Sequence, residues 1–177
     1  MTKGKSLIRA LNRRGTRNTK KPAVATKGKT LPEPSCCERC GAIFSRQTWR
    51  QGRAVTQAFM AKVNWTVCPA CEQASSGEYY GRVVLRGAFV AAHEEAIRRR
   101  IQNVATLAGV TQPERRIVSI DRDRHGLDVL TTSQKLAHRI VHELKKTFRG
   151  RASYAWSDDD GSLFATWQRD DVPGTGR

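Results

Sequence analysis

Residues 36–41 read Cys-Cys-Glu-Arg-Cys-Gly, and residues 68–71 read Cys-Pro-Ala-Cys. A zinc ion takes four ligands at tetrahedral corners, and two residues between cysteines let both thiolates of a pair turn toward one ion. Gly41 permits the tight turn that follows the first pair. The two pairs therefore predict one four-thiolate zinc site formed by Cys37, Cys40, Cys68 and Cys71.

Other uses of these cysteines remain open from the sequence alone. Cys36 competes with Cys37, because its spacing to Cys40 is only one residue longer. A redox dithiol would need a strand followed by a helix, which residues 34–37 do not suggest. Structural disulfides are disfavoured because the chain shows no secretory signal, so we expect a reducing, cytoplasmic compartment. Four cysteine ligands would leave no open coordination position, which indicates a structural metal.

Positive charge is concentrated at the start of the chain. Residues 1–30 carry ten lysines and arginines and no acidic residue, whereas the whole chain has a net charge of +16. Such a segment repels itself and has little to bury, so we expect a disordered basic tail over residues 1–35 whose partner is a polyanion. The predicted RNA contacts in the tail are Lys3, Lys5, Arg9, Arg13, Arg14, Arg17, Lys20, Lys21, Lys27 and Lys29.

Two other interpretations of the tail are weaker. An anionic membrane would attract the charge, but only Leu7, Ile8 and Leu11 could anchor it, and no stretch approaches the roughly 20 apolar residues of a membrane span. An arginine-rich start without acidic residues also resembles a mitochondrial presequence. We therefore expect no membrane partner.

Beyond the tail, hydrophobic periodicity predicts an α+β fold. A zinc ribbon over residues 36–79 precedes a small sheet with two helices over residues 80–169, and residues 170–177 form a frayed end. The predicted order is strand 82–86, helix 91–108, strands 117–120 and 127–130, a helix that begins after Thr132 or Ser133, and strands 153–157 and 163–168. Both helices are expected on one face of the sheet.

The segment between the cysteine pairs is basic and aromatic. It contains no acidic residue from Gly41 to Val67. Arginine can grip phosphate with two hydrogen bonds, and tryptophan can stack on bases. We therefore predict RNA contacts by Arg46, Arg50 and Arg53, with Trp49 as a further candidate. The competing interpretation, favoured for both Trp49 and Trp65, is that they form the core of the small module.

Catalysis has little support in the sequence. His138 and His142 stand four residues apart, but no third metal ligand accompanies them, so a helix surface is expected. Asp158–Asp160 fit a solvated turn. No phosphate-binding glycine loop and no serine nucleophile elbow occur. We expect a protein that is not an enzyme and takes no small-molecule substrate.

The order of these features resembles a known family. Residues 37–169 are similar to the amino-terminal region of the large-ribosomal-subunit export adaptor family, also called nonsense-mediated-decay factor three. The matching elements are the pairs Cys37/Cys40 and Cys68/Cys71, Trp49 between them, the strand Gly126–Leu130, then Ser133 and Ala137-His138 at the second helix. The family carries an earlier cysteine cluster where this chain has its basic tail, and it has later domains and export signals.

The resemblance implies zinc at the four cysteines and docking on the intersubunit face of the large ribosomal subunit, near the tRNA sites. Combined with the charge, it predicts a non-catalytic, ribosome-associated factor that binds ribosomal RNA, with a role in idling, protection or assembly. A general nucleic-acid-binding or transcription-associated zinc-ribbon protein is the main alternative, and a protein-interaction adaptor with an incidental tail is a third.

Overall fold

The computed structural model of the chain describes residues 31–51 and 56–171. The basic tail up to residue 30, Arg53 and residues 172–177 lie outside the described residues, so the predictions made for them stay predictions. A boundary between compact units falls between Leu31 and Pro32, and residues 32–177 form one unit. The predicted tail ended too late, because Ser35 is fully buried in the first strand of the cysteine module.

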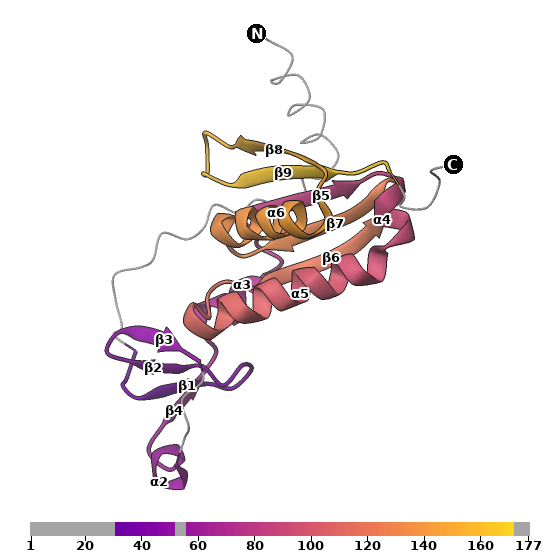
Figure 1. The fold of residues 1–177 in the computed structure, drawn as a ribbon. Coiled ribbons are helices and arrows are strands. Elements are labelled where there is room, and N and C mark those ends of the chain that lie inside the picture. Colours follow the sequence, from indigo (N-terminus) through magenta and orange to yellow (C-terminus); the bar gives the residue numbers. More distant parts are fainter. Residues whose placement is uncertain (1–30, 52–55, 172–177) are drawn as a thin grey trace. The chain divides into compact units, whose positions relative to one another are not determined.

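The fold is α+β, as predicted, with two small mixed sheets (Figure 1). The first sheet belongs to the cysteine module and has the strand order β3-β2-β1-β4, with β1 and β4 parallel. Its strands are β1 (Ser35–Cys37), β2 (Ile43–Ser45), β3 (Thr48–Arg50) and β4 (Asn64–Thr66), and its helices are α2 (Gln57–Met60) and α3 (Pro69–Ser76). Strands of three residues bury little, so pairing alone holds this sheet weakly.

A carboxylate fixes the hairpin between β2 and β3. Arg46 and Gln47 form its turn with φ angles of 52° and 56°. Two positive φ angles match the right-handed twist of the flanking strands. They are sterically unfavourable for residues other than glycine. Both turn N–H groups donate to the Glu33 carboxylate at 2.8 Å, which compensates that cost.

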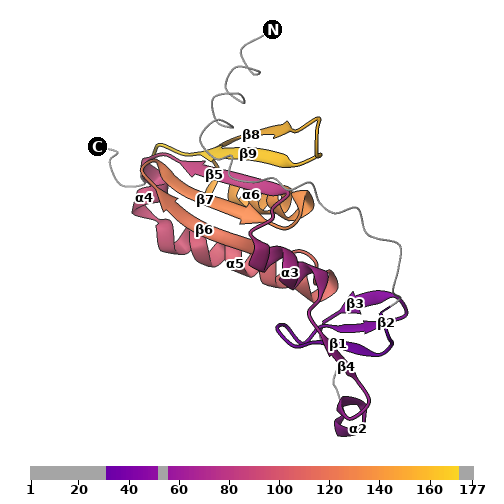
Figure 2. The same cartoon turned by 180° about the vertical axis from the view of Figure 1, so that it is seen from behind.

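The second sheet has the order β6-β7-β5-β9-β8, in which β5 and β9 are parallel and every other pair is antiparallel. Its strands are β5 (Gly81–Arg86), β6 (Ile117–Asp123), β7 (Gly126–Thr131), β8 (Arg151–Trp156) and β9 (Leu163–Gln168). Helices α5 (Glu94–Thr111) and α6 (Gln134–Phe148) lie on one face of this sheet, as Figures 1 and 2 show from opposite sides.

The core of this second domain forms where the apolar faces of the helices pack against the apolar face of the sheet. The predicted apolar stripe of α5 is buried, namely Ile97, Ile101, Val104 and Ala108. The stripe of α6 is buried through Leu136, Ile140 and Leu144, and alternate residues of β7 and β9 face them. One contiguous apolar cluster results, which can stabilise this domain independently of the cysteine module.

The first predicted helix differs from the structure in one respect. The chain forms a short helix α4 (Ala88–Ala92), breaks at His93, and then begins α5. His93 leaves helical geometry with φ −125° and ψ 25°, and its ring stacks on Phe89 at 4.0 Å between centroids. Because Phe89 and Val90 are buried against the sheet, tertiary packing sets the helix direction at this point.

The second predicted helix begins where expected, but without the expected side-chain cap. Ser133 is the N-cap of α6, yet its side chain makes no capping hydrogen bond. Thr131 Oγ1 instead donates to the Ser133 carbonyl oxygen at 2.9 Å. Among the helices that the structure describes, none combines the length and the apolar character needed to cross a membrane.

We expect substitution of Gly126 to weaken the fold. Gly126 has φ 143°, and a Cβ atom there would lie 1.9 Å from the Leu85 carbonyl oxygen. Gly126→Ala should therefore lower the free energy of unfolding by about 2 kcal/mol or more, as measured by urea denaturation. Gly109→Ala is the matched control, because a Cβ at this α5 position meets nothing closer than 3.9 Å and should stabilise the helix by up to about 1 kcal/mol. Equal stability of the two variants would contradict the close approach of β5 and β7.

Candidate metal centre

Two tight turns bring the four predicted cysteines together. In the first, Cys37 ends β1, and the Gly41 N–H donates to the Cys37 carbonyl oxygen at 2.8 Å while Gly41 adopts φ 69°. In the second, Cys68 is the N-cap of α3, with Pro69 at the first helical position and Cys71 in the first turn. A positive φ angle is available to glycine at low cost, and proline is favoured where a helix begins.

The geometry of the four sulfur atoms suits a metal ion. All four Sγ atoms lie within 4.8 Å of one another. The Sγ atoms of Cys37 and Cys71 are 3.8 Å apart, and those of Cys40 and Cys68 are also 3.8 Å apart. The Cys68 N–H donates to the Cys37 sulfur at 3.3 Å, as a backbone donor does to a thiolate. The arrangement can therefore hold one ion between two cysteine pairs 27 residues apart.

Burial and backbone hydrogen bonds act on three thiols of the cluster. Burial raises the pKa of Cys68 and of Cys71 above the ordinary thiol value. Burial acts in the same direction on Cys37, but backbone N–H groups, that of Cys68 first, outweigh it and lower the Cys37 pKa to about 6. Backbone N–H groups therefore favour the thiolate form of Cys37, whereas a bound cation would favour it at Cys68 and Cys71.

Little else holds the cysteine module together. Its buried cluster consists of three cysteines and two alanines, with Cys40, Trp49 and Val67 packed beside them. So little apolar area cannot offset the conformational entropy of ordering the module. A metal ion would supply the missing stabilisation, which assigns it a structural role.

Cys36 lies outside the cluster. It precedes Cys37 in β1, and successive side chains of a strand point to opposite faces of a sheet. Cys36 is 4% exposed, and burial raises the pKa of its thiol. The structure therefore groups Cys37 with the other three cysteines and leaves Cys36 as a buried thiol.

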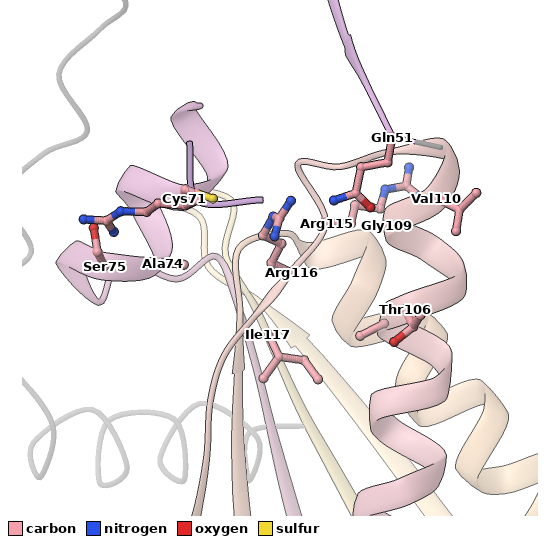
Figure 3. A pocket seen from close by; sticks show the side chains of 12 residues that line it. Gln51, Cys71, Ala74, Ser75, Thr106, Gly109, Val110, Arg115, Arg116 and Ile117 are labelled. Carbon is pink, nitrogen blue, oxygen red and sulfur yellow. The ribbon is translucent and has the colours of Figure 1, made fainter. Parts of the chain in front are cut away.

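An open cleft of about 590 Å³ adjoins the metal centre. Its walls come from the cysteine module and from the end of α5, and its lining includes Arg39, Cys71, Arg115 and Arg116. Figure 3 shows Arg115 and Arg116 beside Gln51, with Cys71 and Ser75 across the cleft. No carboxylate lines it, and within residues 31–51 and 56–171 none of the three arginines forms an ion pair.

Arg116 joins this cleft to the metal centre. Its Nε donates to the Pro113 carbonyl oxygen at 2.8 Å, and its charge acts on Cys71 to lower the pKa of that thiol, against the larger effect of burial. With the Gln51 amide turned so that its nitrogen donates to the Gly109 carbonyl oxygen, its oxygen accepts from Arg116 Nη2 at 3.2 Å. Arg116 thus brings a positive charge, held by these hydrogen bonds, to the lining of the cleft.

The described residues that were predicted to bind RNA differ in their exposure to solvent. Arg46 and Arg50 are exposed on the β2–β3 hairpin and are available to a ligand, although the Glu33 carboxylate lies at the same turn. Trp49 is half-buried against the cysteine cluster and 5.3 Å from the Phe44 ring centroid, so it packs in the module as the core interpretation predicts. That interpretation is wrong for Trp65, which is 53% exposed.

The arginines of the cleft were missed by the sequence analysis. Arg39 lies inside the first cysteine pair, and Arg115 and Arg116 follow α5 in a stretch without a motif. Each of these arginines lies near a glutamate in the sequence, so the local sequence suggests that its positive charge is neutralised by a neighbouring carboxylate. Only the fold separates these arginines from the neighbouring carboxylates.

Comparison with known proteins adds no family to this description. No family model matches the chain, and a search of curated proteins found no match. The site is therefore interpreted from its geometry: a four-sulfur cluster suited to a metal ion, and a cleft lined by arginines next to it.

Replacing one clustered cysteine should abolish metal binding, whereas replacing Cys36 should not. We expect Cys40→Ser to lose the bound ion, because a tetrahedral site with three thiolates binds far more weakly. Cys36→Ala should retain about one ion per chain, because Cys36 lies outside the cluster. Elemental mass spectrometry of the purified proteins measures both. Loss of the ion from Cys36→Ala, or its retention in Cys40→Ser, would contradict the ligand assignment.

Proposed function

We propose that the protein is a non-catalytic, ribosome-associated factor that binds ribosomal RNA through a zinc-stabilised module. The observation that carries the proposal is the arginine-lined cleft beside the cysteine cluster, in a chain with net charge +16. The proposed compartment is the cytoplasm, in keeping with reduced cysteines.

Zinc is the metal that best suits the site. Sulfur ligands 2.3 Å from a tetrahedral centre lie about 3.8 Å from one another. Both of the short sulfur–sulfur distances in the cluster are 3.8 Å. Thiolate ligands favour zinc over magnesium or calcium, which take oxygen ligands. The four cysteines would then hold zinc in a closed site that orders the module and leaves no position for a reacting water.

The distribution of charge supports a polyanionic partner. Many described carboxylates are engaged within the protein, such as Asp128 with Arg82 and Glu143 with Arg100. Arg39, Arg115 and Arg116 have no such partner among residues 31–51 and 56–171. Arginines held close together and unneutralised bind phosphate oxygens well, and each phosphate bound releases counterions.

The choice of ribosomal RNA rests on the family resemblance of residues 37–169. That family binds the large subunit, and the zinc module, the Gly126–Leu130 strand and the helix that follows Ser133 occur here in the same order. We therefore propose docking on the large subunit near the tRNA sites, with a role in idling, protection or assembly. A general nucleic-acid-binding zinc-ribbon protein remains the second candidate, because the cleft chemistry alone fits any phosphate backbone.

Removal of zinc should unfold the cysteine module alone. Metal binding contributes on the order of 10 kcal/mol or more to such modules, whereas the domain from Gly81 to Gln168 has an apolar core of its own. Excess chelator should therefore expose residues 36–79 to limited proteolysis and leave residues 80–169 resistant, as followed by mass spectrometry. Unchanged cleavage of the module after complete metal removal would refute a structural role for the ion.

Binding to the large ribosomal subunit should depend on salt and on the cleft. In gradient sedimentation of cell extract, we expect the protein with the large subunit at low salt and its release at high salt. If about six phosphates are contacted, log affinity should fall with log salt at a slope near −4 to −5. Arg39→Gln/Arg115→Gln should weaken binding and reduce the slope by about 1.4 to 1.8, because two phosphate contacts are lost.

Arg99→Gln is the matched control for this experiment, since Arg99 is an exposed arginine of α5 that pairs with Glu95. It should leave the slope unchanged. Absence of the wild-type protein from every ribosomal fraction at low salt would exclude the ribosomal proposal. Equal competition by duplex DNA and by ribosomal RNA fragments would favour the general nucleic-acid-binding protein instead.

A further inference from the structure

The outward face of helix α6 carries a stripe of basic side chains, in which a histidine lies among two lysines and an arginine. Lys135, Arg139, His142 and Lys146 are all exposed, and their spacing of four, three and four residues places them along one line of the helix. At a rise of 1.5 Å per residue the stripe is about 16 Å long. The single carboxylate of α6, Glu143, accepts a hydrogen bond from Arg100 of α5, so it is already neutralised.

Two exposed aromatic side chains lie on strand β8, and one of them contacts α6. Tyr154 and Trp156 alternate along the edge strand β8, so they share one face of the sheet. It is the face that α6 covers, because the ring centroids of Tyr154 and His138 are 5.1 Å apart. Tyr154 is 39% exposed and Trp156 is 58% exposed.

Core packing does not explain Trp156. Trp167 on the neighbouring strand β9 shows what packing requires, since it is fully buried and its indole N–H donates to the Arg149 carbonyl oxygen at 2.8 Å. Trp156 is mostly exposed on an edge strand, where a large apolar side chain gains little from folding and marks a binding surface when others accompany it. Its position on the face of the sheet that α6 covers, together with the basic residues of α6, suits a ligand with flat, apolar rings and negative charge.

We propose that α6 and β8 form a binding surface for single-stranded RNA, in which unpaired bases stack on Trp156 and Tyr154 while phosphates contact the Lys135–Lys146 stripe. Base stacking on aromatic side chains combined with a positively charged path is the general mode of single-strand recognition. The inference rests on the proposed RNA-binding function, and it adds a surface remote from the cysteine cluster and a preference for unpaired nucleotides.

A second copy of the chain is a poorer occupant of this surface. Edge strand β8 could pair with another copy, but pairing there would bring two cationic α6 faces together. Charge complementarity therefore favours a nucleic acid over self-association.

The turn between β8 and β9 limits where the RNA backbone can run. Asp158, Asp159 and Asp160 are exposed there, and Gln134 Nε2 donates to the Gly161 carbonyl oxygen, which places the turn beside the start of α6. The Ser162 backbone N–H holds the pKa of Asp160 below its usual value, so this carboxylate stays ionised. Phosphates should therefore follow the stripe away from this turn.

The test measures binding of the full-length protein to a fluorescein-labelled oligouridine and to a duplex RNA of the same length. Trp156→Ala should weaken oligouridine binding about 5-fold or more without changing the salt slope, because stacking releases no counterions. Lys135→Gln/Arg139→Gln should weaken binding and reduce the slope by about 1.4. Trp156→Phe should restore most of the affinity, and Asp158→Asn/Asp159→Asn should increase it, because two repulsive charges are removed.

The controls separate this surface from other exposed apolar positions, from duplex binding and from loss of the fold. Leu107→Ala removes an exposed apolar side chain of α5, 64% exposed, and should bind as the wild type does. Duplex RNA offers no unstacked bases, so Trp156→Ala should leave duplex binding unchanged. Thermal denaturation confirms that each variant is folded.

Three results would overturn the inference. If Trp156→Ala and Lys135→Gln/Arg139→Gln bind oligouridine as the wild type does, while the wild type sediments with ribosomes, the surface is wrong and the proposed function stands. If the wild type binds no RNA, the proposed function fails as well. If Trp156→Ala converts a dimer into a monomer in analytical ultracentrifugation, the surface is an interface between copies.

Discussion

The convergence of four cysteine sulfurs is the constraint on which the first half of the fold depends. The strands of the cysteine module are three residues long, and its buried cluster holds little besides cysteine and alanine. Hydrogen bonds between such short strands would be lost to water without a further link. A metal ion bound by the four cysteines would supply that link, because it would join the end of β1 at Cys37 to the start of α3 at Cys68 across 30 intervening residues, next to the parallel pair β1 and β4.

The cysteine module also contacts the second domain. Gln73 of α3 donates from Nε2 to the Thr132 carbonyl oxygen at 3.0 Å, and Gln51 and Arg116 extend the contact toward Gly109. The arginine-lined cleft lies along this junction. If a metal ion orders the module, it therefore also holds Arg39 in the lining that this residue shares with Arg115 and Arg116.

The two proposed RNA surfaces follow from the way the fold uses its carboxylates. Acidic residues outside the turns are largely taken up by arginines of the same domain: Asp128 pairs with Arg82, Glu94 with Arg98 and Arg122, and Glu143 with Arg100. Among the cations without an ion pair in residues 31–51 and 56–171, one group lines the cleft and another lies along α6. Positive charge is thus concentrated in two patches. Each patch attracts phosphate more strongly than the same charge spread over the surface.

Sequence periodicity and spacing determined much of this protein. The buried stripe of α5, the strand pair around Asp123–Gly126 and the grouping of Cys37 with Cys40, Cys68 and Cys71 all follow from local patterns, and the structure confirms them. These features are local because helix and strand periods, turn residues and paired cysteines act over a few residues. The same patterns failed at His93, where the packing of Phe89 breaks the helix, and at Trp65, whose exposure depends on which edge of the small sheet β4 occupies.

Only the tertiary structure decided which charges remain unpaired. Arg39, Arg115 and Arg116 come from two distant segments and line one cleft, whereas their glutamate neighbours in sequence, Glu38 and Glu114, do not line it. Likewise, nothing in the local sequence of Trp156 and Trp167 indicates that the first lies exposed on an edge strand beside α6 while the second is buried in the core. Strand order and helix placement set these outcomes, because they arise from long-range contacts that periodicity does not encode.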